Sequence, residues 1–449
     1  MLLATALALL SITSGSHVTR LNGVGRAAPA TARDWPHWRG PDGTGVAPSA
    51  GSLPETWSDE SNVRWRVELP GRGASTPVAF GEHLFLTTAV ALDERPAPGE
   101  RGEFHGGGGP QAEHEFVVLA IERATGEVAW ERTVARGTPR EGFHRSYGSH
   151  ASMSPVTDGE RLIASFASQG VYCFDLAGEL LWHTDPEVVL EMRRQFGGGA
   201  SPVLHGDSVI LNLDQEGPSF LLVLDAATGE ERWRVARDEP STWGTPLVTD
   251  VDGTTQVILS GTHRTRGYDL EDGRVVWECG GLGLNAIPNP LRHGDSVIVM
   301  SGYRDPNLMA IALGESGDLT DTDAVLWQNA KGASYTPSPV LLDGRLFCLG
   351  DRGNLSAFDA GSGAPLYVEE RLPRGLEFKS SPIAVGDRLY LLAETGEVVV
   401  VRAADELEVL ATIPALTGAA DDMFVASPIA LDGALYLRGM HQLIAIGGS

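Results

Sequence analysis

Few residues of this chain have the types and spacing that chemistry at a site requires. The three cysteines, Cys173, Cys279 and Cys348, lie far apart, and neither C-x-x-C nor C-x-x-C-H occurs. Zinc fingers, thioredoxin-like redox chemistry and c-type haem attachment are therefore not indicated. Cys173 in "VYCFDL" and Cys348 in "LFCLGD" sit in strand-like apolar runs, which favours small buried hydrophobic residues.

Three fragments of catalytic or metal-binding motifs are incomplete. "HGGGG" at 105–109 is similar to the oxyanion loop of esterases, but no G-x-S-x-G nucleophile elbow accompanies it. His114-Glu115 lacks the second histidine of H-E-x-x-H. His105, Glu113 and His114 would bind a metal only if their loop folded back, and a solvated loop is the simpler interpretation. We expect no catalytic residue, no metal site and no cofactor.

Charge excludes one class of partner. The chain has 449 residues and a formal net charge of −25, from 34 Lys and Arg against 59 Asp and Glu. Such an acidic surface repels phosphate backbones, and no basic stripe interrupts it, so nucleic-acid binding is not expected. No stretch is long enough for a transmembrane helix.

The N-terminus has features of an export signal. The apolar run from Leu2 to about Leu10 is too short to span a bilayer and is typical of a signal-peptide core, although no Lys or Arg precedes it. We predict a signal peptide and linker over 1–32, an N-terminal extension over 33–61, and a periplasmic or secreted location. A misassigned start codon is the alternative.

A recurring Ser-Pro or Thr-Pro phrase, followed by a turn and an alternating apolar run, sets the repeat. The anchor prolines are Pro77, Pro155, Pro202, Pro246, Pro290, Pro339, Pro382 and Pro428. The first spacing is 78 residues and the others lie between 43 and 49, near the period of a four-stranded propeller blade.

A second phrase, of which "FLLVLDAATGEERW" (220–233) is the clearest example, places an aromatic residue four positions after a turn glycine. Asp225 can cap its own turn, and Gly229 can adopt a positive φ so that the chain reverses. Each aromatic then reaches the same point on the next strand, where it can pack against the neighbouring blade. The blade-docking aromatics predicted here are Trp65, Trp130, Trp182, Trp233, Trp277, Trp327 and Tyr367.

Eight anchors predict an all-β, eight-bladed propeller of four-stranded antiparallel blades over 62–449. For the third blade we expect strands at roughly 201–204, 208–213, 220–225 and 230–235, and a short helix at 185–196 before it. The last blade lacks its fourth strand, and "NVRWRVELPG" (62–71) has the pattern to supply it and close the ring. Residues 91–115, rich in Gly, Pro and charge, are expected to form a flexible insertion in the first blade.

The phrase "DAATGEERW" with its relatives, the eight anchors and the opening "DWPHWRGPDGTGV" (34–46) resemble the pyrroloquinoline quinone (PQQ) repeat superfamily of eight-bladed propellers. That superfamily includes an exported branch of uncharacterised role, quinoprotein alcohol dehydrogenases and the propeller lipoprotein of outer-membrane protein assembly. In the dehydrogenases the resemblance implies a quinone held in the central funnel between a tryptophan and a disulfide of adjacent cysteines, with calcium and an aspartate base. This chain has no adjacent cysteines.

Propeller geometry indicates where a ligand would bind, because residues just before the anchors line one mouth of the channel. These candidates are His150, Ser152, Trp243, Asn285, Tyr335, Lys379 and Phe424. Taken singly, the simpler interpretation of Trp243 is channel packing, and that of Lys379 is an ion pair with an acid such as Glu377. The set suits a small polar ligand or a peptide.

Three functions remain open. The leading hypothesis is a non-catalytic extracytoplasmic scaffold whose loops or funnel bind a protein, peptide or glycan partner. The alternatives are a PQQ-dependent dehydrogenase with calcium and a sensor that binds a small ligand. The sequence does not set the partner or the oligomeric state.

Overall fold

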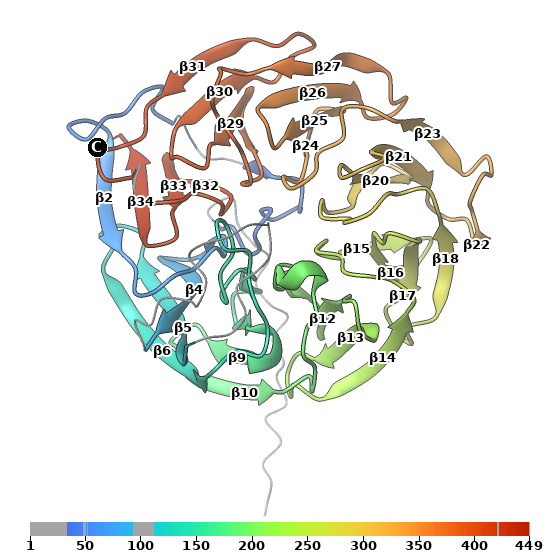
Figure 1. The fold of residues 1–449 in the computed structure, drawn as a ribbon, viewed down its shortest axis with the longest axis horizontal. Coiled ribbons are helices and arrows are strands. Elements are labelled where there is room, and N and C mark those ends of the chain that lie inside the picture. Colours follow the sequence, from blue (N-terminus) through green and yellow to red (C-terminus); the bar gives the residue numbers. More distant parts are fainter. Residues whose placement is uncertain (1–33, 48–50, 52, 93–111, 420–421, 449) are drawn as a thin grey trace, which may run out of the picture.

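A computed structural model of the chain describes residues 34–47, 51, 53–92, 112–419 and 422–448. Eight sheets stand around a central channel like the blades of a propeller, as Figure 1 shows looking along the axis of the ring. The predicted architecture is confirmed. The expectations for 1–33 and for most of the insertion at 91–115, with His105 among them, fall outside the described residues.

Each blade is an antiparallel meander that runs from an inner strand at the channel to an outer strand at the rim. Blade 1 comprises β3 (Val78–Phe80), β4 (His83–Ala91), β5 (His114–Glu122) and β6 (Val128–Gly137), and blade 2 comprises β7 (Val156–Thr157), β8 (Arg161–Ser165), β9 (Val171–Asp175) and β10 (Leu180–Thr184). Blade 3 comprises β11 (Val203–His205), β12 (Ser208–Leu213), β13 (Ser219–Asp225) and β14 (Glu231–Arg237). Blade 4 comprises β15 (Leu247–Val251), β16 (Thr254–Leu259), β17 (Thr265–Asp269) and β18 (Val275–Cys279).

Blades 5 to 8 repeat this order, and the last of them takes its outer strand from the N-terminal part of the chain. Blade 5 comprises β19 (Leu291–His293), β20 (Ser296–Ser301), β21 (Asn307–Ala312) and β23 (Val325–Asn329), and blade 6 comprises β24 (Val340–Leu342), β25 (Arg345–Gly350), β26 (Asn354–Asp359) and β27 (Pro365–Arg371). Blade 7 comprises β28 (Ile383–Val385), β29 (Arg388–Leu392), β30 (Val398–Arg402) and β31 (Val409–Ile413). Blade 8 comprises β32 (Ile429–Leu431), β33 (Ala434–Arg438), β34 (Gln442–Gly447) and β2 (Val63–Glu68).

The predicted ring closure is therefore observed. Strand β2 pairs antiparallel with β34, so that Val67 lies opposite Leu443 and Glu68 opposite Gln442. Without β2, the fully buried strand β34 would present an unpaired edge. Two short strands add to blade edges: β1 (Val46–Ala47) pairs with the inner strand β28, and β22 (Gly317–Asp318) pairs with the outer strand β18, both in parallel.

One predicted element is wrong. The segment 185–196 is not an α-helix; only the 3-10 turn η2 (Arg193–Gln195) forms there, and η1 (Ala167–Gln169) is the other short 3-10 turn. Arg194 and Gln195 have φ values of 53° and 58°, which no right-handed helix contains. The apolar residues Val188, Leu190 and Met192 alternate along this segment and are buried against blades 2 and 3.

The recurring turn forms as its residues predict. The Asp225 carboxylate accepts hydrogen bonds from the backbone N–H groups of Ala227 and Thr228 at 2.9 and 3.0 Å, and Gly229 has a φ of 74°. Trp233 on the next strand then packs its ring on Gly273 in the turn of blade 4 and donates from Nε1 to Leu270 O at 3.0 Å. A side chain at Gly273 would overlap that ring.

The same contact joins other blades. The indole nitrogens of Trp65, Trp130, Trp182 and Trp327 each donate to a backbone carbonyl in the corresponding turn of the next blade. Trp277 differs from the expectation: it is fully buried and donates to Gln256 within its own blade. The corresponding turn of blade 5 is replaced by the segment containing β22, so Trp277 has no equivalent turn to pack on.

The anchors build a closed belt of hydrogen bonds around the channel. The residue before each anchor proline offers a side-chain oxygen to the backbone N–H of the equivalent residue in the preceding blade, at 2.8 to 3.1 Å. In chain order these residues are Thr76, Ser154, Ser201, Thr245, Asn289, Ser338, Ser381 and Ser427, and the last donates back to the first. The belt explains why a short polar residue precedes each proline.

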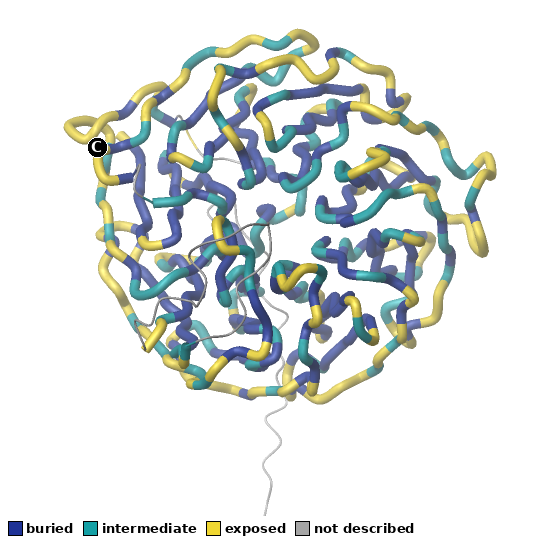
Figure 2. Tube along the Cα trace, viewed as in Figure 1, coloured by how far each residue is buried: buried dark blue, intermediate teal, exposed yellow. Residues whose placement is uncertain are grey.

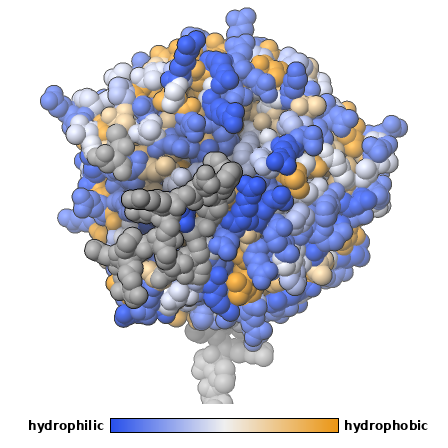
Figure 3. Space-filling view, in the orientation of Figure 1, coloured by the Kyte–Doolittle hydropathy of each residue, from blue (hydrophilic) through white to orange (hydrophobic). Residues whose placement is uncertain are grey.

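The hydrophobic core lies between neighbouring blades. In Figure 2 the two middle strands of each blade are largely buried, while the outer strands mostly alternate between half-buried and exposed residues. Between blades 1 and 2, for example, Phe85 and Phe116 pack with Phe174. The face of the ring seen in Figure 3 is mostly hydrophilic, with hydrophobic residues in small separate groups. No helix within the described ranges is long and apolar enough to cross a membrane.

Candidate functional site in the central channel

One end of the channel is closed by the segment Asp34–Val46, which we call the plug. Trp35 is fully buried and its backbone bridges Ala79 of blade 1. Arg39 is 1% exposed, and its two terminal nitrogens donate to Pro339 O and Pro382 O at 2.7 Å each. Burial lowers the pKa of Arg39 to about 9. The plug thus fixes a charged side chain inside the ring.

Above the plug lies an open cavity of about 200 Å³, which we call the funnel cavity. Trp38 of the plug lines its base, and the loops that precede the inner strands form its walls. The side chains that line it are mainly aromatic, with a few hydroxyl groups among them: Trp38, His144, Tyr147, Ser152, Phe196, Trp243, Tyr335, Thr336 and Ser338. Such a mixture suits a ligand held by ring contacts and a few hydrogen bonds.

Three of the seven predicted residues meet in this cavity, namely Ser152, Trp243 and Tyr335. Trp243 donates from its indole nitrogen to Gly197 O at 2.8 Å, so its ring orientation is fixed. Tyr335 stacks on Tyr303, with ring centroids 5.2 Å apart.

Asn285 and Lys379 lie one contact further out. Asn285 is buried and donates to the Tyr335 hydroxyl at 3.2 Å. Lys379 lies 5.3 Å from the centre of the Tyr147 ring, and its ion pairs are with Asp351 at 3.1 Å and Glu394 at 3.2 Å. The expected pairing with Glu377 is therefore replaced by two acids that are distant in sequence.

Two predicted residues do not reach the cavity. Phe424 is 1% exposed and belongs to the hydrophobic core next to blades 7 and 8. His150 packs edge-on against His114 and Phe143, with ring centroids 4.9 and 4.7 Å away, and lines a much smaller neighbouring cavity. Burial, with His114 adding to it, lowers the pKa of His150 to about 3.

Four of the lining residues that the sequence did not single out come from segments outside the repeat. Trp38 belongs to the plug, Phe196 follows η2, and His144 and Tyr147 lie in the loop between blades 1 and 2. The His144 and Tyr147 rings stack with centroids 3.5 Å apart. For Trp38 the available sequence signal was the opening phrase "DWPHWRG", which resembles the start of related propellers.

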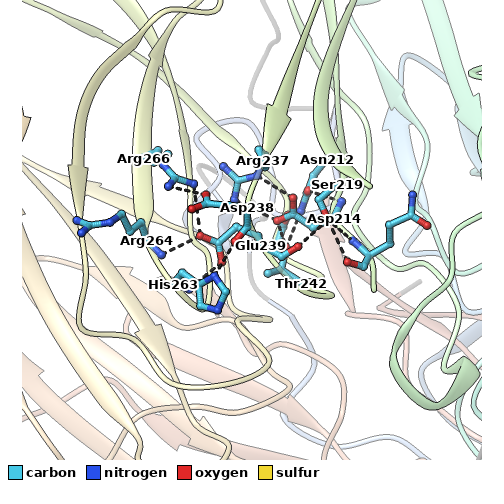
Figure 4. A network of polar contacts seen from close by, with 12 residues as sticks. Asn212, Asp214, Ser219, Arg237, Asp238, Glu239, Thr242, His263, Arg264 and Arg266 are labelled. Carbon is cyan, nitrogen blue, oxygen red and sulfur yellow. Dashed lines mark hydrogen bonds and ion pairs between the residues drawn. The ribbon is translucent and has the colours of Figure 1, made fainter. Parts of the chain in front are cut away.

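A buried polar network holds the loop that carries Trp243 (Figure 4). Asp214 forms a two-bond ion pair with Arg237, at 2.7 and 3.1 Å, and accepts from the Thr242 hydroxyl at 2.7 Å. Asn212 donates to Thr242 on one side of Trp243 and to Gly244 O on the other. Both charged side chains are fully buried, so their geometry is held tightly.

The network extends into blade 4 through Glu239, whose carboxylate accepts from the backbone N–H groups of His263 and Arg264 at 2.7 and 2.8 Å. Burial raises the pKa of Glu239. Burial alone would lower the pKa of Arg237, but Asp214 outweighs it and raises that pKa. Charged Arg237 and Asp214 therefore support the wall of the funnel cavity from behind and do not line it.

Three ionisable groups at or next to the cavity keep their protons at neutral pH. Burial raises the pKa of Tyr147 to about 12 and also raises that of Tyr335, so both phenols stay protonated at neutral pH. Burial would lower the pKa of Lys379, but Asp351 and Glu394 raise it, so the amine stays charged. These groups can donate hydrogen bonds, and none of the three is poised to take a proton.

The residues present do not fit the quinone site of the dehydrogenases. Cys173, Cys279 and Cys348 are free, buried and in different blades, so no disulfide of adjacent cysteines can face a tryptophan. Across the described part of the chain, no three His, Cys, Asp or Glu side chains come together as metal ligands would. We derive no reaction step through such a group.

Comparison with solved structures identifies the same fold in proteins of different function. BamB from Moraxella catarrhalis is 15% identical with a TM-score of 0.53, over 80% of this chain and 99% of that one. A europium-containing methanol dehydrogenase is 9% identical with a TM-score of 0.59, over 91% and 90%. A quinohemoprotein alcohol dehydrogenase from Comamonas testosteroni is 12% identical with a TM-score of 0.57, over 94% and 82%. At these identities only the fold is shared.

Comparison of the sequence with known families identifies the family of the chain. No curated protein sequence matches the chain. One family model does, described as "Outer membrane protein assembly factor BamB", over residues 56–182, 114–280, 167–320 and 283–408. Together these overlapping matches run from residue 56 to residue 408, that is, from β2 to β30. The chain therefore belongs to the BamB-like family of PQQ-repeat propellers.

Proposed function

We propose that this protein is a non-catalytic extracytoplasmic scaffold that binds a protein or peptide partner through its central funnel. The observation that supports this most directly is the funnel cavity, an open pocket of about 200 Å³ based on Trp38 and walled by Trp243 and Tyr335. Rigid aromatic pockets with a few polar groups anchor partner side chains in many interfaces. The description of the family as an assembly factor agrees with a protein partner.

Rigidity also supports a binding role. The belt and the closed ring fix the blades, and the Asp214–Arg237 pair fixes the loop of Trp243. Because a preorganised pocket loses little freedom on binding, a short partner segment would suffice for recognition. Flat rings next to the hydroxyls of Ser152 and Thr336 would also suit a glycan, which is the second partner class that we propose.

Peptide selection tests the proposal. Peptides selected from a random library on the purified protein should bind with a Kd that rises at least tenfold in Trp243→Ala. Trp233→Phe changes an aromatic residue on the outer rim and should leave that Kd unchanged. Equal binding by Trp243→Ala would remove the funnel from the proposal, and a sugar array read with the same two variants would separate glycan from peptide.

Reconstitution distinguishes the scaffold from a PQQ-dependent dehydrogenase. Incubation with PQQ and calcium, followed by absorbance spectra and dye-linked alcohol oxidation, should show neither uptake nor turnover. Stoichiometric uptake with turnover would overturn the scaffold. A thermal-shift screen with sugars and metal ions would reveal a small-ligand sensor instead.

The extracytoplasmic location is tested separately. Fusion of the full chain to a β-lactamase that is active only outside the cytoplasm should confer ampicillin resistance on the host cell. Deletion of Leu2–Leu10 should abolish that resistance while the fusion protein is still made. Resistance without this apolar run would contradict a signal peptide.

A further inference from the structure

The plug shows how the inner edges of the blades bind an extended backbone. Four carbonyl groups of the plug accept hydrogen bonds from four inner strands, those of blades 1, 2, 6 and 7. The bonds are Ala79 N to Trp35 O at 2.8 Å, Thr157 N to Pro36 O at 2.9 Å, Leu341 N to Thr44 O at 3.4 Å and Ala384 N to Gly45 O at 2.8 Å. Each donor is the second residue after an anchor proline.

This position is set by the hairpin that follows each anchor. In blade 3, His205 and Ser208 close a two-residue turn, so they form the hydrogen-bonded pair. The alternation of an antiparallel ladder then leaves Leu204, opposite Val209, with its N–H directed away from β12 and toward the channel. Val248 in blade 4 has the same place, because Val251 and Thr254 close its turn.

The inner edges of blades 3 and 4 are not covered by the plug. In the described residues, neither Leu204 N nor Val248 N has a backbone partner outside its own sheet. Both residues line a second cavity, of about 270 Å³, between the plug and blades 3 to 5. We call it the plug cavity; Trp38 lines both it and the funnel cavity.

The acceptors of the plug cavity follow from the same repeat. Arg39 donates to the carbonyls of the anchor prolines of blades 6 and 7, Pro339 and Pro382. The equivalent prolines of blades 3, 4 and 5, Pro202, Pro246 and Pro290, line the plug cavity. By the symmetry of the repeat, their carbonyls are directed at the channel as well.

Charge adds a preference. Asp42 is exposed at the rim of the plug cavity, and the whole chain carries −25. Arg39 also lines the cavity, but its terminal nitrogens are directed at blades 6 and 7. Asp42 and the net charge of the chain attract a cationic ligand, the guanidinium of Arg39 opposes it, and the carbonyls of the wall offer it acceptors.

We propose that the plug cavity binds a short extended peptide with an arginine side chain. Its backbone carbonyls would accept from Leu204 and Val248, as Thr44 and Gly45 do for blades 6 and 7, and its guanidinium would donate to the anchor carbonyls of blades 3 to 5. The site lies on the other side of Trp38 from the funnel and does not depend on the function proposed for it.

Amide hydrogen exchange on the full chain tests the site without any variant. In the free protein, Leu204 and Val248 should exchange faster than the equivalent Leu341 and Ala384, which the plug protects. Acetyl-Arg-Thr-Gly-amide should slow exchange at Leu204 and Val248 alone. If those two amides are already as protected as Leu341, or if the peptide does not change them, the proposal is overturned.

Two further comparisons define the ligand class. Acetyl-Ala-Thr-Gly-amide should bind at least tenfold more weakly than the arginine peptide, and free arginine should also bind more weakly. Equal binding of either would overturn the proposed class.

Val248→Trp fills the cavity and should abolish peptide binding. Leu326→Trp adds the same bulk on the outer strand β23, where Leu326 is 52% exposed, and should leave binding unchanged. Unimpaired binding by Val248→Trp would place the peptide elsewhere.

Discussion

Trp233 is the residue at which the contact between blades can be tested most simply. Its half-buried ring packs on Gly273, and its indole N–H bonds to Leu270 O. Trp233→Ala removes both and should lower the free energy of unfolding by about 2–4 kcal/mol, near the lower end of the range for a large buried aromatic. Urea denaturation measures this loss as a shift of the midpoint, provided that the dependence of the free energy of unfolding on urea concentration is the same in both proteins.

The control for this substitution is Trp233→Phe, which keeps a six-membered ring beside Gly273 and loses the hydrogen bond together with the smaller, pyrrole part of the indole. It should cost about 1 kcal/mol, the usual net value of such a bond. If the alanine variant were as stable as the native chain, Trp233 would have no part in holding blade 3 to blade 4.

His150 makes stability depend on pH. Its pKa falls from 6.5 to about 3 on folding, through burial and the neighbouring His114. A lowered histidine pKa means that the unfolded chain binds the proton first, so stability is complete above pH 6.5 and is lost as the pH falls toward 3. The loss is about 1.4 kcal/mol for each pH unit in that window.

His150→Phe should remove this dependence. The new ring would lie among Phe116 and Phe143, which already contact His150. Urea unfolding should find the two proteins similar at pH 7, and the variant more stable by about 2 kcal/mol at pH 5. The carboxylates of the two proteins are the same, so their contribution cancels. Parallel pH profiles would show that His150 titrates in the folded state as it does in the unfolded state.

At the scale of elements, the belt depends on one hydroxyl per blade. Ser201 accepts from Ser154 N at 3.0 Å, and both residues are buried. Ser201→Ala leaves that N–H unpaired in the interior and should destabilise the protein by about 1–3 kcal/mol. Ser201→Thr keeps the hydroxyl, which Thr76 and Thr245 already supply elsewhere in the belt, and should cost much less. Equal losses in thermal unfolding would mean that volume at this position, and not the hydroxyl, is what matters.

The elements were largely predictable because each carries its own repeated pattern. In blade 3 the strands begin and end within two residues of the expected positions, since apolar alternation and the Asp225–Gly229 turn fix both ends. The conformation of the segment 185–196 was not predictable. Its apolar residues fill a gap between blades, and from the sequence alone such a loop is mistaken for a short helix. Trp277 shows the same limit: its pattern matches the other docking residues, but the turn it would meet is absent.

The candidate site was predictable only where it follows the repeat. Ser152, Trp243 and Tyr335 come just before anchors, so propeller geometry alone directs them into the channel. Trp38, His144, Tyr147 and Phe196 come from the plug and from loops between blades, which have no fixed register. Lys379 shows the same limit for ion pairs, since Asp351 and Glu394 meet it only once blades 6 and 7 have folded against each other.

For the whole molecule, stability depends on the joint between β2 and β34, where the two ends of the chain close the ring. Leu69 N donates to His441 O at 2.8 Å, so the alternation of the ladder makes Glu68 and Gln442 a non-hydrogen-bonded pair. Their side chains then lie at the separation that suits a disulfide. The native cysteines are buried, so they should not compete for it.

Glu68→Cys with Gln442→Cys should therefore lock the ring. The crosslink closes a loop of nearly the whole propeller, for which chain entropy allows up to about 5 kcal/mol of stabilisation. The oxidised double variant should unfold several degrees above the same protein reduced with dithiothreitol, which is its matched control. Gln442 donates to Asp422, so the reduced form should be slightly less stable than the native chain. Identical melting of the oxidised and reduced forms would contradict the expected gain, because an unstrained crosslink restricts the unfolded chain wherever the ring opens.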